Sequence, residues 1–482
     1  MRFQPGPKAA RQPISRKVWQ LAAVIVFGAF MSGLDATIVN VGLDTIARDL
    51  GATLGQVQWV SSAHLIALGV SLPAAGWLGR RVGVGRMWLA ALAAFTFTSA
   101  ACAAAGNVET LIALRVAQGI AAGLLIPAGQ TILGQAAGPG RLGRVMATLG
   151  LAVGLAPALG PVLGGLLLDR GSWPWLFLIN VPIGLVGLVL GLRLIPRGAR
   201  DSGERLDRVG LLLVTAGVPA LVYGLNAWGE QRSILAPGVF MPIAVGGILV
   251  ALFVRHARRH PDPILDLCLF RLPVFAAASV TTFANGAAMF GAFLLLPLYF
   301  QVGRGEEPLE TGLLLIGLSV GTALTMPFVG SMIDKIGSGV VSVAGGLATI
   351  ATTAPFVFLP LDTDELTIQV LLFARGIALA LAIMPPTVAA YEAVSQRQLP
   401  DATSQINVLQ RVGGAIGGSL LAVTVAGSMS SGTASALQLS FAALTGFSAL
   451  SLSASIWLLH TEQSRSANGA AGIAPHPTES TP

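Results

Sequence analysis

The sequence contains little charge. Of its 482 residues, 11% are charged, whereas a soluble globular domain carries about a quarter. Hydrophobic residues make up 54%. Lipid rather than water is therefore the expected solvent for most of the surface, and the composition predicts an integral membrane protein.

Cysteine, lysine and histidine are also scarce, which excludes several classes of protein. The two cysteines, Cys102 and Cys268, fall at opposite ends of the expected topology, so we expect no disulfide framework. The three lysines, Lys8, Lys17 and Lys335, complete no G-x-x-x-x-G-K-[ST] motif, which argues against an ATP-driven pump. The five histidines lie mostly in loops or the tail and form no H-E-x-x-H motif or thiol–histidine pair. We therefore expect no enzyme, no cofactor and no bound metal.

Long apolar runs, in contrast, recur along the whole chain. A membrane-spanning helix needs about 20 consecutive apolar residues. The runs lack the period-two alternation of a membrane barrel, so helices fit better. Fourteen spans are predicted, at residues 20–44, 56–78, 87–105, 107–133, 145–168, 174–195, 209–227, 237–255, 273–301, 311–332, 340–360, 367–391, 402–427 and 436–460.

The net charge of +7 is unevenly distributed. If the N-terminus is cytoplasmic, 22 of the 29 Lys and Arg residues fall in inside loops and tails, four in outside loops and three within spans. This positive-inside bias predicts a multi-pass protein of the inner membrane with both termini in the cytoplasm, rather than a nucleic-acid-binding protein. Span 1 follows Arg16 and Lys17 as a signal peptide would, but it runs about 25 residues and contains Asp35, so it should be retained.

Three local patterns occur twice along the chain with similar offsets. Gly76–Gly83 returns as Gly330–Gly337, 254 residues later; Arg115 returns as Arg375, 260 later; and the glycine-rich motif at 160–165 returns at 413–418, 253 later. Two related six-helix units around a central path are typical of secondary transporters. The predicted parts are a cytoplasmic tail (1–19), an N-terminal six-helix bundle (20–195), two extra helices with inside loops (196–272), a C-terminal six-helix bundle (273–460) and a disordered cytoplasmic tail (461–482).

Five motifs in chain order carry a resemblance to a known family. They are Leu34-Asp35-Ala36-Thr37-Ile38-Val39-Asn40 in span 1, the loop Gly76–Gly83 with Arg86, Leu111–Gly123 with Arg115, Gln118 and Gly119 in span 4, Gly160-Pro161-Val-Leu-Gly164-Gly165 in span 5, and Trp173–Gly184 entering span 6. Together they resemble the major facilitator superfamily, and within it the fourteen-helix drug:proton antiporters of the EmrB/QacA type.

The resemblance implies an all-α membrane protein with the major facilitator fold, in which 14 transmembrane helices form two six-helix halves plus two extra helices. It also implies proton-coupled export of small amphipathic compounds, with a periplasmic adaptor and an outer-membrane channel as partners in part of the family. Two positions depart from the family pattern. Arg80 stands where the family's loop usually carries Asp, although the second copy keeps Asp334, and His64 stands where a Tyr is common.

Ionisable residues inside the spans are the first candidates for function, because charge in hydrocarbon is costly and usually faces a cavity or a partner. Asp35, His64 and Arg115 all lie roughly 12–14 Å below the outer surface, at a rise of ~1.5 Å per residue. We expect Asp35 to bind the coupling proton, with Arg115 controlling how readily it does so. Alternatively, Asp35 and Arg115 form a permanent structural ion pair. His64 is either a proton shuttle or a side chain that simply hydrogen-bonds a neighbour.

Two further sets of residues follow from the resemblance and the repeat. The antiporter motif of span 5 is either a kinked interface between the halves or ordinary small-residue packing, and its residues are Gly154, Pro157, Gly160, Pro161, Gly164 and Gly165. The conformational loops of the two halves supply Gly76, Arg80, Arg81, Gly83, Asp334 and Lys335.

An apolar cavity that accepts many compounds needs adaptable aromatic and Met side chains with few polar groups. Spans 9, 10 and 12 supply the candidates Asn285, Met289, Phe290, Phe293, Tyr299, Met326 and Arg375, all of which could instead face lipid or the core. Met289 is the repeat counterpart of Asp35, so Arg375 has no acid beside it in the repeat and is expected to be structural or to contact an anion. Export of one endogenous metabolite, antibiotic or siderophore remains the alternative function, and a channel or receptor is the alternative of a different class.

Overall fold

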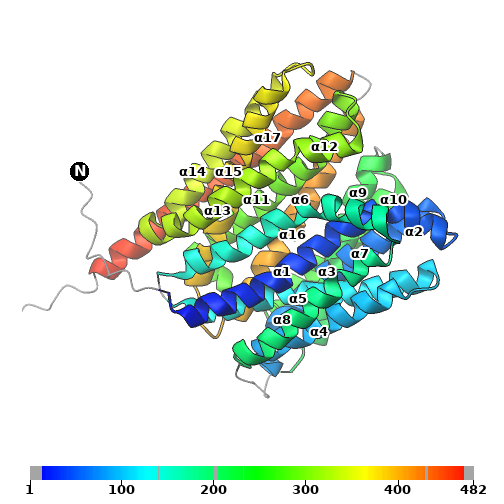
Figure 1. Cartoon of the computed structure of the whole chain (residues 1–482). Helices are drawn as coiled ribbons and strands as arrows, with labels where there is room; N and C mark the ends of the chain where they lie inside the picture. Colours follow the sequence, from blue (N-terminus) through cyan, green and yellow to red (C-terminus); the bar gives the residue numbers. More distant parts are fainter. Residues whose placement is uncertain (1–13, 139, 199–204, 232, 429–431, 472–482) are drawn as a thin grey trace, which may run out of the picture.

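The protein is a bundle of long helices (Figure 1). The computed structural model describes residues 14–471 apart from residues 139, 199–204, 232 and 429–431, and these described residues contain no β-strand. The helices are α1 (Arg16–Val41), α2 (Leu43–Asp49), α3 (Leu54–Val82), α4 (Val84–Ala103), α5 (Val108–Ala137), α6 (Leu142–Arg170), α7 (Trp175–Leu178), α8 (Asn180–Leu194), α9 (Arg208–Gln231), α10 (Pro237–Ala257), η1 (Leu267–Arg271), α11 (Pro273–Leu298), η2 (Tyr299–Gly303), α12 (Pro308–Leu314), α13 (Ile316–Ile336), α14 (Ser338–Thr353), η3 (Ala354–Val357), α15 (Glu365–Glu392), α16 (Leu399–Ser428) and α17 (Thr433–Ala471).

The long helices coincide with the predicted spans. Thirteen segments of the described residues are long and apolar enough to cross a membrane. The helix α6, which has 29 residues, corresponds to the fifth predicted span. The prediction of an all-α, multi-pass membrane protein is therefore confirmed. The last helix is longer than predicted. Residues 461–471 were assigned to a disordered tail, but they continue α17 to Ala471, and Glu462 accepts a hydrogen bond from Gly339 N at 2.8 Å.

Two groups of six helices show the same packing pattern. In the first group α3 packs on α5, α1 on α6, and α4 on both α5 and α8. In the second group α13 packs on α15, α11 on α16, and α14 on both α15 and α17. Figure 1 shows the first group in blue to teal-green and the second in green to red. The internal repeat seen in the sequence thus corresponds to two halves of the same architecture.

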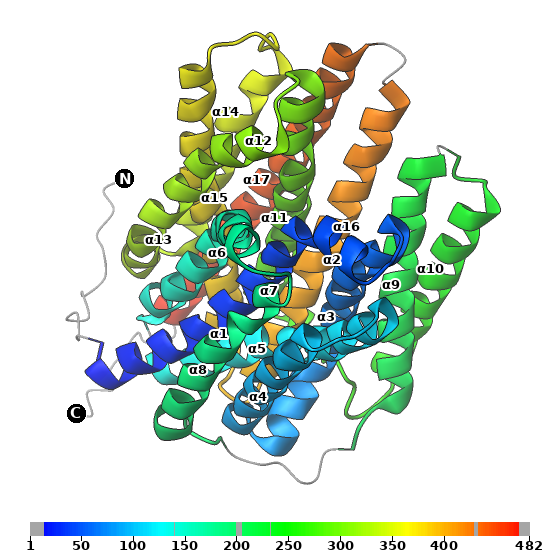
Figure 2. The ribbon, with the colours of Figure 1, turned by 45° about the vertical axis from the view of Figure 1, so that its right-hand side comes forward.

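The extra helices α9 and α10 form a hairpin at the side of the bundle (Figure 2). The helix α9 packs on α16 of the second half and on α3 of the first half. Both helices expose many apolar side chains, among them Leu212, Tyr223 and Ile248, as expected for a hairpin that faces lipid on its outer side.

The repeated loop glycines end the corresponding helices in the two halves. Gly83 follows α3 with φ of 92°, and Gly337 follows α13 with φ of 91°. This backbone conformation is readily accessible to glycine and rarely adopted by other residues. In each case the next helix starts directly afterwards, so the glycines produce the tight turn that reverses the chain at the membrane surface.

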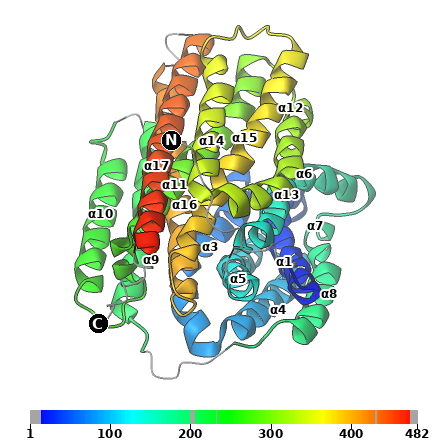
Figure 3. The same cartoon turned by 90° about the vertical axis from the view of Figure 1, so that its left-hand side faces the viewer.

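The helices α1 and α17 begin and end, respectively, on the same side of the bundle (Figures 1 and 3). We call this side the tail side and the opposite one the far side. The largest buried hydrophobic cluster lies toward the tail side and takes residues from both halves, including Leu133 of the first half and Val388 of the second. Toward the far side each half has a separate cluster, around Phe177 and Phe441 respectively. The halves therefore share their core on the tail side.

Candidate functional site

The carboxylate of Asp35 lies at the centre of a buried polar cluster between α1, α3, α5 and α8. Arg115 Nη1 donates to Asp35 Oδ2 at 2.5 Å. Gln118 Nε2 and Asn180 Nδ2 donate to Asp35 Oδ1 at 3.1 and 2.8 Å. A buried charge is tolerated when it is paired and its remaining lone pairs are hydrogen-bonded. We call Asp35, His64, Arg115, Gln118 and Asn180 the Asp35 cluster.

Arg115 is held in place by several groups besides Asp35. Its Nε donates to the Val60 carbonyl oxygen at 2.9 Å, and its Nη1 also donates to Gln118 Oε1 at 2.7 Å. The guanidinium carbon lies 5.7 Å from the centre of the Phe177 ring, within the range of a cation–π contact. These contacts fix the guanidinium group of Arg115 among the surrounding helices, where its side chain is only 1% exposed.

The ring of His64 lies beside the ion pair. Its Nε2 is 3.9 Å from Asp35 Oδ2. Neither ring nitrogen has a hydrogen-bond partner within the described part of the chain. The close approach of α3 and α5 depends on Gly119, because a Cβ there would collide with the His64 carbonyl oxygen. The sequence placed Asp35, His64 and Arg115 at one depth, and the structure brings these three side chains together.

Gln118 and Asn180 were not predicted from the sequence to contact Asp35. Both are neutral amides, and both are 0% exposed. Asn180 Nδ2 also donates to Ser99 Oγ at 3.1 Å, which in turn donates to the Phe177 carbonyl oxygen at 3.0 Å. The available signal was that each amide lies within or at the edge of an apolar span and inside a recognised motif. Arg115, Gln118 and Asn180 together pair and hydrogen-bond the ionised carboxylate of Asp35.

The conformational-loop residues form ion pairs between the halves on the tail side. Arg80 of α3 pairs with Asp401 in the first turn of α16. In the second half Asp334 of α13 accepts from Arg144 Nε at 2.7 Å and from Gly143 N at 3.2 Å, both at the start of α6. Arg80 stands where the family's loop usually carries Asp. In this chain the acidic residue of the ion pair is Asp401, which lies on α16 of the other half.

The other loop residues have different roles. Gly76 lets α3 approach Asp401, since a Cβ there would come within 2.6 Å of its carboxylate. The Arg81 guanidinium carbon lies 5.5 Å from the centre of the Trp77 ring, Gly83 makes the turn described above, and Lys335 is exposed.

The antiporter motif lies in α6, and two of its glycines, Gly160 and Gly164, pack against α1 within the first half. A Cβ on Gly160 would collide with Thr37 of α1, one on Gly164 would lie 3.2 Å from the Ile38 carbonyl oxygen, and one on Gly165 would meet no atom within 4 Å. The contact of α6 with the second half is made nearer its start, where Gly150 faces Met326. The surroundings of Gly154, Pro157 and Pro161 lie outside what the structure describes.

The structure separates the cavity candidates into groups. Asn285, Met289 and Arg375 line one small pocket inside the second half. Phe290 packs against Gly414 and the ring of Phe293, which is itself 42% exposed. Tyr299 lies in an aromatic cluster with Phe300, Phe356 and Phe441, and Met326 lies against α6.

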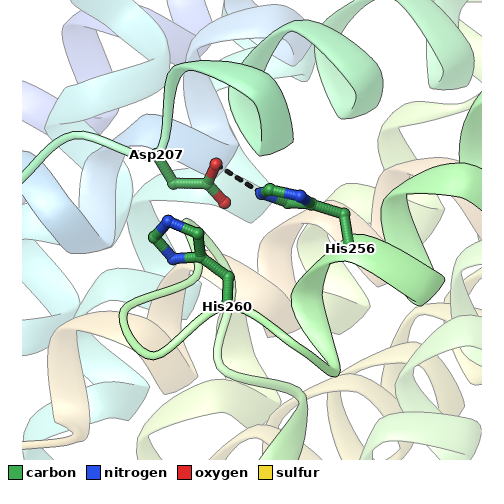
Figure 4. Close-up of side chains that lie close together, drawn as sticks. All are labelled: Asp207, His256 and His260. Carbon is green, nitrogen blue, oxygen red and sulfur yellow. Dashed lines mark hydrogen bonds and ion pairs between the residues drawn. The ribbon is translucent and has the colours of Figure 1, made fainter.

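A second titratable cluster lies on the tail side of the α9–α10 hairpin (Figure 4). Asp207 Oδ1 is 2.7 Å from His256 Nε2 and accepts from Gly210 N at 2.7 Å, while Oδ2 accepts from Ile264 N at 3.3 Å. His260 turns its ring toward the same carboxylate.

Each of Asp207, His256 and His260 offers one ligand atom within 4.8 Å of the others, so this group could hold a metal ion. No metal site was predicted from the sequence. The four-residue spacing of His256 and His260 at the end of α10 is the signal that could have indicated this group. The Asp207 carboxylate already accepts these hydrogen bonds, however, so its evident role is to join the start of α9 to the end of α10.

Comparison with known proteins agrees with this architecture. The sequence matches the Major Facilitator Superfamily over residues 25–418. It is 35% identical over 411 residues to the multidrug resistance protein B homolog of Mycobacterium tuberculosis, a match that covers 83% of this chain and 75% of that protein. It is 29% identical over 414 residues to the uncharacterized MFS-type transporter YhcA of Bacillus subtilis, covering 86% and 77% of the two chains.

Among solved structures, the fold resembles the proton:xylose symporter XylE with a TM-score of 0.65 at 12% sequence identity, and the match covers 91% of this chain and 95% of that one. At this identity the likeness concerns the fold alone. Together with the family match and the two six-helix halves, it shows that this chain is a multi-pass membrane transporter of small molecules that belongs to the Major Facilitator Superfamily.

Proposed function

We propose that this transporter is a proton-coupled antiporter that exports small amphipathic compounds across the inner membrane, as multidrug efflux proteins do. The observation that carries the proposal is the buried carboxylate of Asp35, held by Arg115, Gln118 and Asn180 between four helices of the first half. The name of the Mycobacterium tuberculosis relative, multidrug resistance protein B homolog, supports the substrate class.

Proton exchange at Asp35 provides the coupling step. While Asp35 is ionised, its charge is compensated by Arg115 at 2.5 Å. When Asp35 takes up a proton, Arg115 remains buried without a counter-charge, which is unfavourable in a medium of low dielectric constant. The protonated state therefore favours a movement of α5 relative to α1. When the helices return to their first arrangement, Asp35 releases the proton on the other side of the membrane.

The tail side is assigned to the cytoplasm. The Lys and Arg residues cluster in the tails and in the loops on this side, in line with the positive-inside rule. The ion pairs Arg80–Asp401 and Arg144–Asp334 join the halves there. In this conformation the cytoplasmic end is therefore closed, and substrate release toward the far side, the periplasm, is the next step of export. A periplasmic adaptor and an outer-membrane channel would receive the compound there.

A flux assay in membrane vesicles tests the proposal. Inside-out vesicles containing the protein should accumulate cationic dyes or antibiotics when an acid-inside proton gradient is imposed, and a protonophore should abolish the accumulation. Downhill flux that survives the protonophore would instead indicate a channel. Accumulation of one endogenous metabolite and of no dye would favour the dedicated exporter. Reporter fusions after Arg258 and Arg304 should report the cytoplasm and the periplasm, and the same side for both would contradict the assigned orientation.

A further inference from the structure

An uncharged hydrogen-bond junction joins the two halves toward the tail side. The side-chain oxygen of Gln130, on α5, accepts from the Tyr391 hydroxyl of α15 at 2.9 Å and from Asn407 Nδ2 of α16 at 2.6 Å. Gln130 belongs to the first half, whereas Tyr391 and Asn407 belong to the second. An amide oxygen has two lone pairs, so this oxygen bridges the halves with both. We call these three residues the Gln130 junction.

The junction lies deeper in the membrane than the ion pair between Arg80 and Asp401. Asn407 follows Asp401 by six residues on α16, which places it roughly 9 Å farther from the tail side at a rise of ~1.5 Å per residue. On α16 between these two residues, the Thr403 hydroxyl lies 2.8 Å from the Thr131 hydroxyl of α5. Polar contacts between the halves therefore continue inward from the membrane surface to the junction.

Burial makes the junction costly to open. Tyr391 is 3% exposed, and Gln130 and Asn407 are half-buried. A buried donor that loses its acceptor carries the full cost of its lost hydration. The Tyr391 hydroxyl can therefore give up Gln130 cheaply only when water enters between the halves. That condition describes the state in which the tail side is open to the cytoplasm.

The junction joins nearly equivalent positions of the internal repeat. Tyr391 follows Gln130 by 261 residues, and Arg375 follows Arg115 by 260. The helices α5 and α15 thus carry, in the same order, a buried arginine and a member of the junction. Because equivalent helices of the two halves meet here, rocking of one half against the other separates these positions.

The helix α5 connects the junction to the Asp35 cluster. Gln130 follows Arg115 by 15 residues, a distance of roughly 22 Å along the helix. Although Pro127 lies between them, α5 is one continuous helix from Val108 to Ala137. A movement of α5 at Arg115 therefore also acts on the bonds of Gln130.

We infer that Gln130 is a latch of the tail side, whose bonds to Tyr391 and Asn407 must break before a cytoplasmic substrate can enter between the halves. The inference rests on the proposed transport function, because it assigns the loading step of export to named residues. It adds an uncharged contact to the ion pairs that close the same side.

Alkylation of a buried cysteine measures opening of the tail side in the purified full-length protein. Leu399, at the start of α16, is 2% exposed, and a Cβ on Gly134 of α5 would come within 2.6 Å of it. Leu399→Cys is made in a Cys268→Ser chain, in which the remaining Cys102 is buried. Gln130→Leu should raise the rate at which a maleimide reacts with Leu399→Cys roughly fivefold, since it removes both bonds of the latch.

Two matched variants separate the latch from a general effect of substitution. Gln130→Glu keeps an oxygen that accepts both bonds, so its cysteine should react as slowly as that of the reference chain. Gln135 lies on the same helix, is exposed, and reaches the Gln396 carbonyl oxygen only at 3.5 Å, so Gln135→Leu should leave the rate unchanged. If Gln130→Leu reacts no faster than Gln135→Leu, Gln130 does not hold the tail side closed.

A double-mutant cycle tests whether Gln130 acts through Tyr391. Tyr391→Phe removes one donor and should also speed the reaction. It should add nothing in the Gln130→Leu chain, where the bond is already lost. Effects that multiply in the double variant would show that the two residues act separately, which would overturn the inference.

Export kinetics give a readout that a loss of packing alone would not produce. A protein with a weakened latch is open to the cytoplasm for a larger fraction of the time, so its apparent affinity for substrate rises. Gln130→Leu should therefore lower the KM for a cytoplasmic dye together with the maximal rate, and a raised KM would contradict the latch. The alkylation test uses neither a proton gradient nor a substrate, so its result is the same if the proposed proton antiport is wrong.

Discussion

At the scale of single residues, the Asp35 cluster contains two kinds of buried polar side chain, ionisable groups and neutral amides. Asp35, His64 and Arg115 are ionisable groups in apolar segments. The free-energy cost of placing charge in hydrocarbon is enough to identify them as functional candidates. Gln118 and Asn180 complete the same cluster. A neutral amide costs less free energy to bury in a membrane helix than a charged group does, and amides are common where membrane helices pack together. Their contact with Asp35 depends on how four helices are rotated against one another, which local sequence does not determine.

Asn180 provides the residue-scale prediction. Its hydrogen bond to Asp35 is to a charged group, and such a bond contributes about 1.5–3 kcal/mol. We expect Asn180→Ala to lower proton-driven export roughly tenfold at equal protein levels, since about 1.4 kcal/mol corresponds to a factor of ten. Ser99→Ala is the matched control, because Ser99 contacts Asn180 and not the carboxylate. A larger loss in Ser99→Ala than in Asn180→Ala would contradict this account of the cluster.

At the scale of helices, hydropathy predicted the spans well because each needs a continuous apolar run. The short helices α2, α7 and α12 were not predicted, since they are too short for periodicity to reveal. The approach of α3 to α5 was also not predictable, because glycines are frequent throughout the chain and the sequence does not show which of them lies at a contact.

Gly119 tests that helix contact. A Cβ at this position would collide with the His64 carbonyl oxygen and lie 3.0 Å from the Ala67 Cβ. Overpacking of this kind costs about 1–3 kcal/mol, so Gly119→Ala should lower both the melting temperature and the export rate by displacing Arg115. Gly69→Ala, in α3 with no atom within 4 Å of the added Cβ, should change neither. Equal behaviour of the two variants would exclude the proposed role of Gly119.

The α9–α10 hairpin gives a prediction on pH. Burial alone would raise the pKa of Asp207, but hydrogen bonds from Gly210 N, His256 and Ile264 N hold the pKa below its ordinary value of 3.8. The ionised carboxylate therefore stabilises the folded state above about pH 4, and this stabilisation is lost as the pH falls further. We expect Asp207→Asn to lower the melting temperature by roughly 1–3 °C at pH 7. The difference from the unmodified protein should shrink below pH 4, and a difference that stays constant with pH would contradict the assignment.

At the scale of the whole molecule, the repeat in the sequence indicated two halves but not where they meet. The order of landmarks gave the two six-helix units, and the structure shows them joined by a common hydrophobic cluster on the tail side. The boundaries at residues 195 and 273 remain a prediction. The contact between Arg80 and Asp401 was not foreseeable, because the acidic partner lies on α16, more than three hundred residues away.

That contact is best tested by exchanging its charges. Arg80→Asp places two acids together between α3 and α16, which should weaken closure of the tail side by about 1–3 kcal/mol and lower export roughly tenfold. Adding Asp401→Arg restores an ion pair of reversed polarity, so the double variant should recover most of the activity. A double variant no better than Arg80→Asp, at equal membrane levels, would show that closure does not depend on this pair.

The most direct test of proton coupling is gradient-driven export by Asp35→Asn compared with His64→Phe. Asn is nearly the same size as Asp and cheaper to bury, so the variant should insert normally. It cannot bind a proton and release it, so uphill export should be abolished while exchange down a substrate gradient continues. His64→Phe should retain uphill export. If Asp35→Asn still concentrates substrate against its gradient, Asp35 does not carry the coupling proton, and loss in His64→Phe would transfer that role to His64.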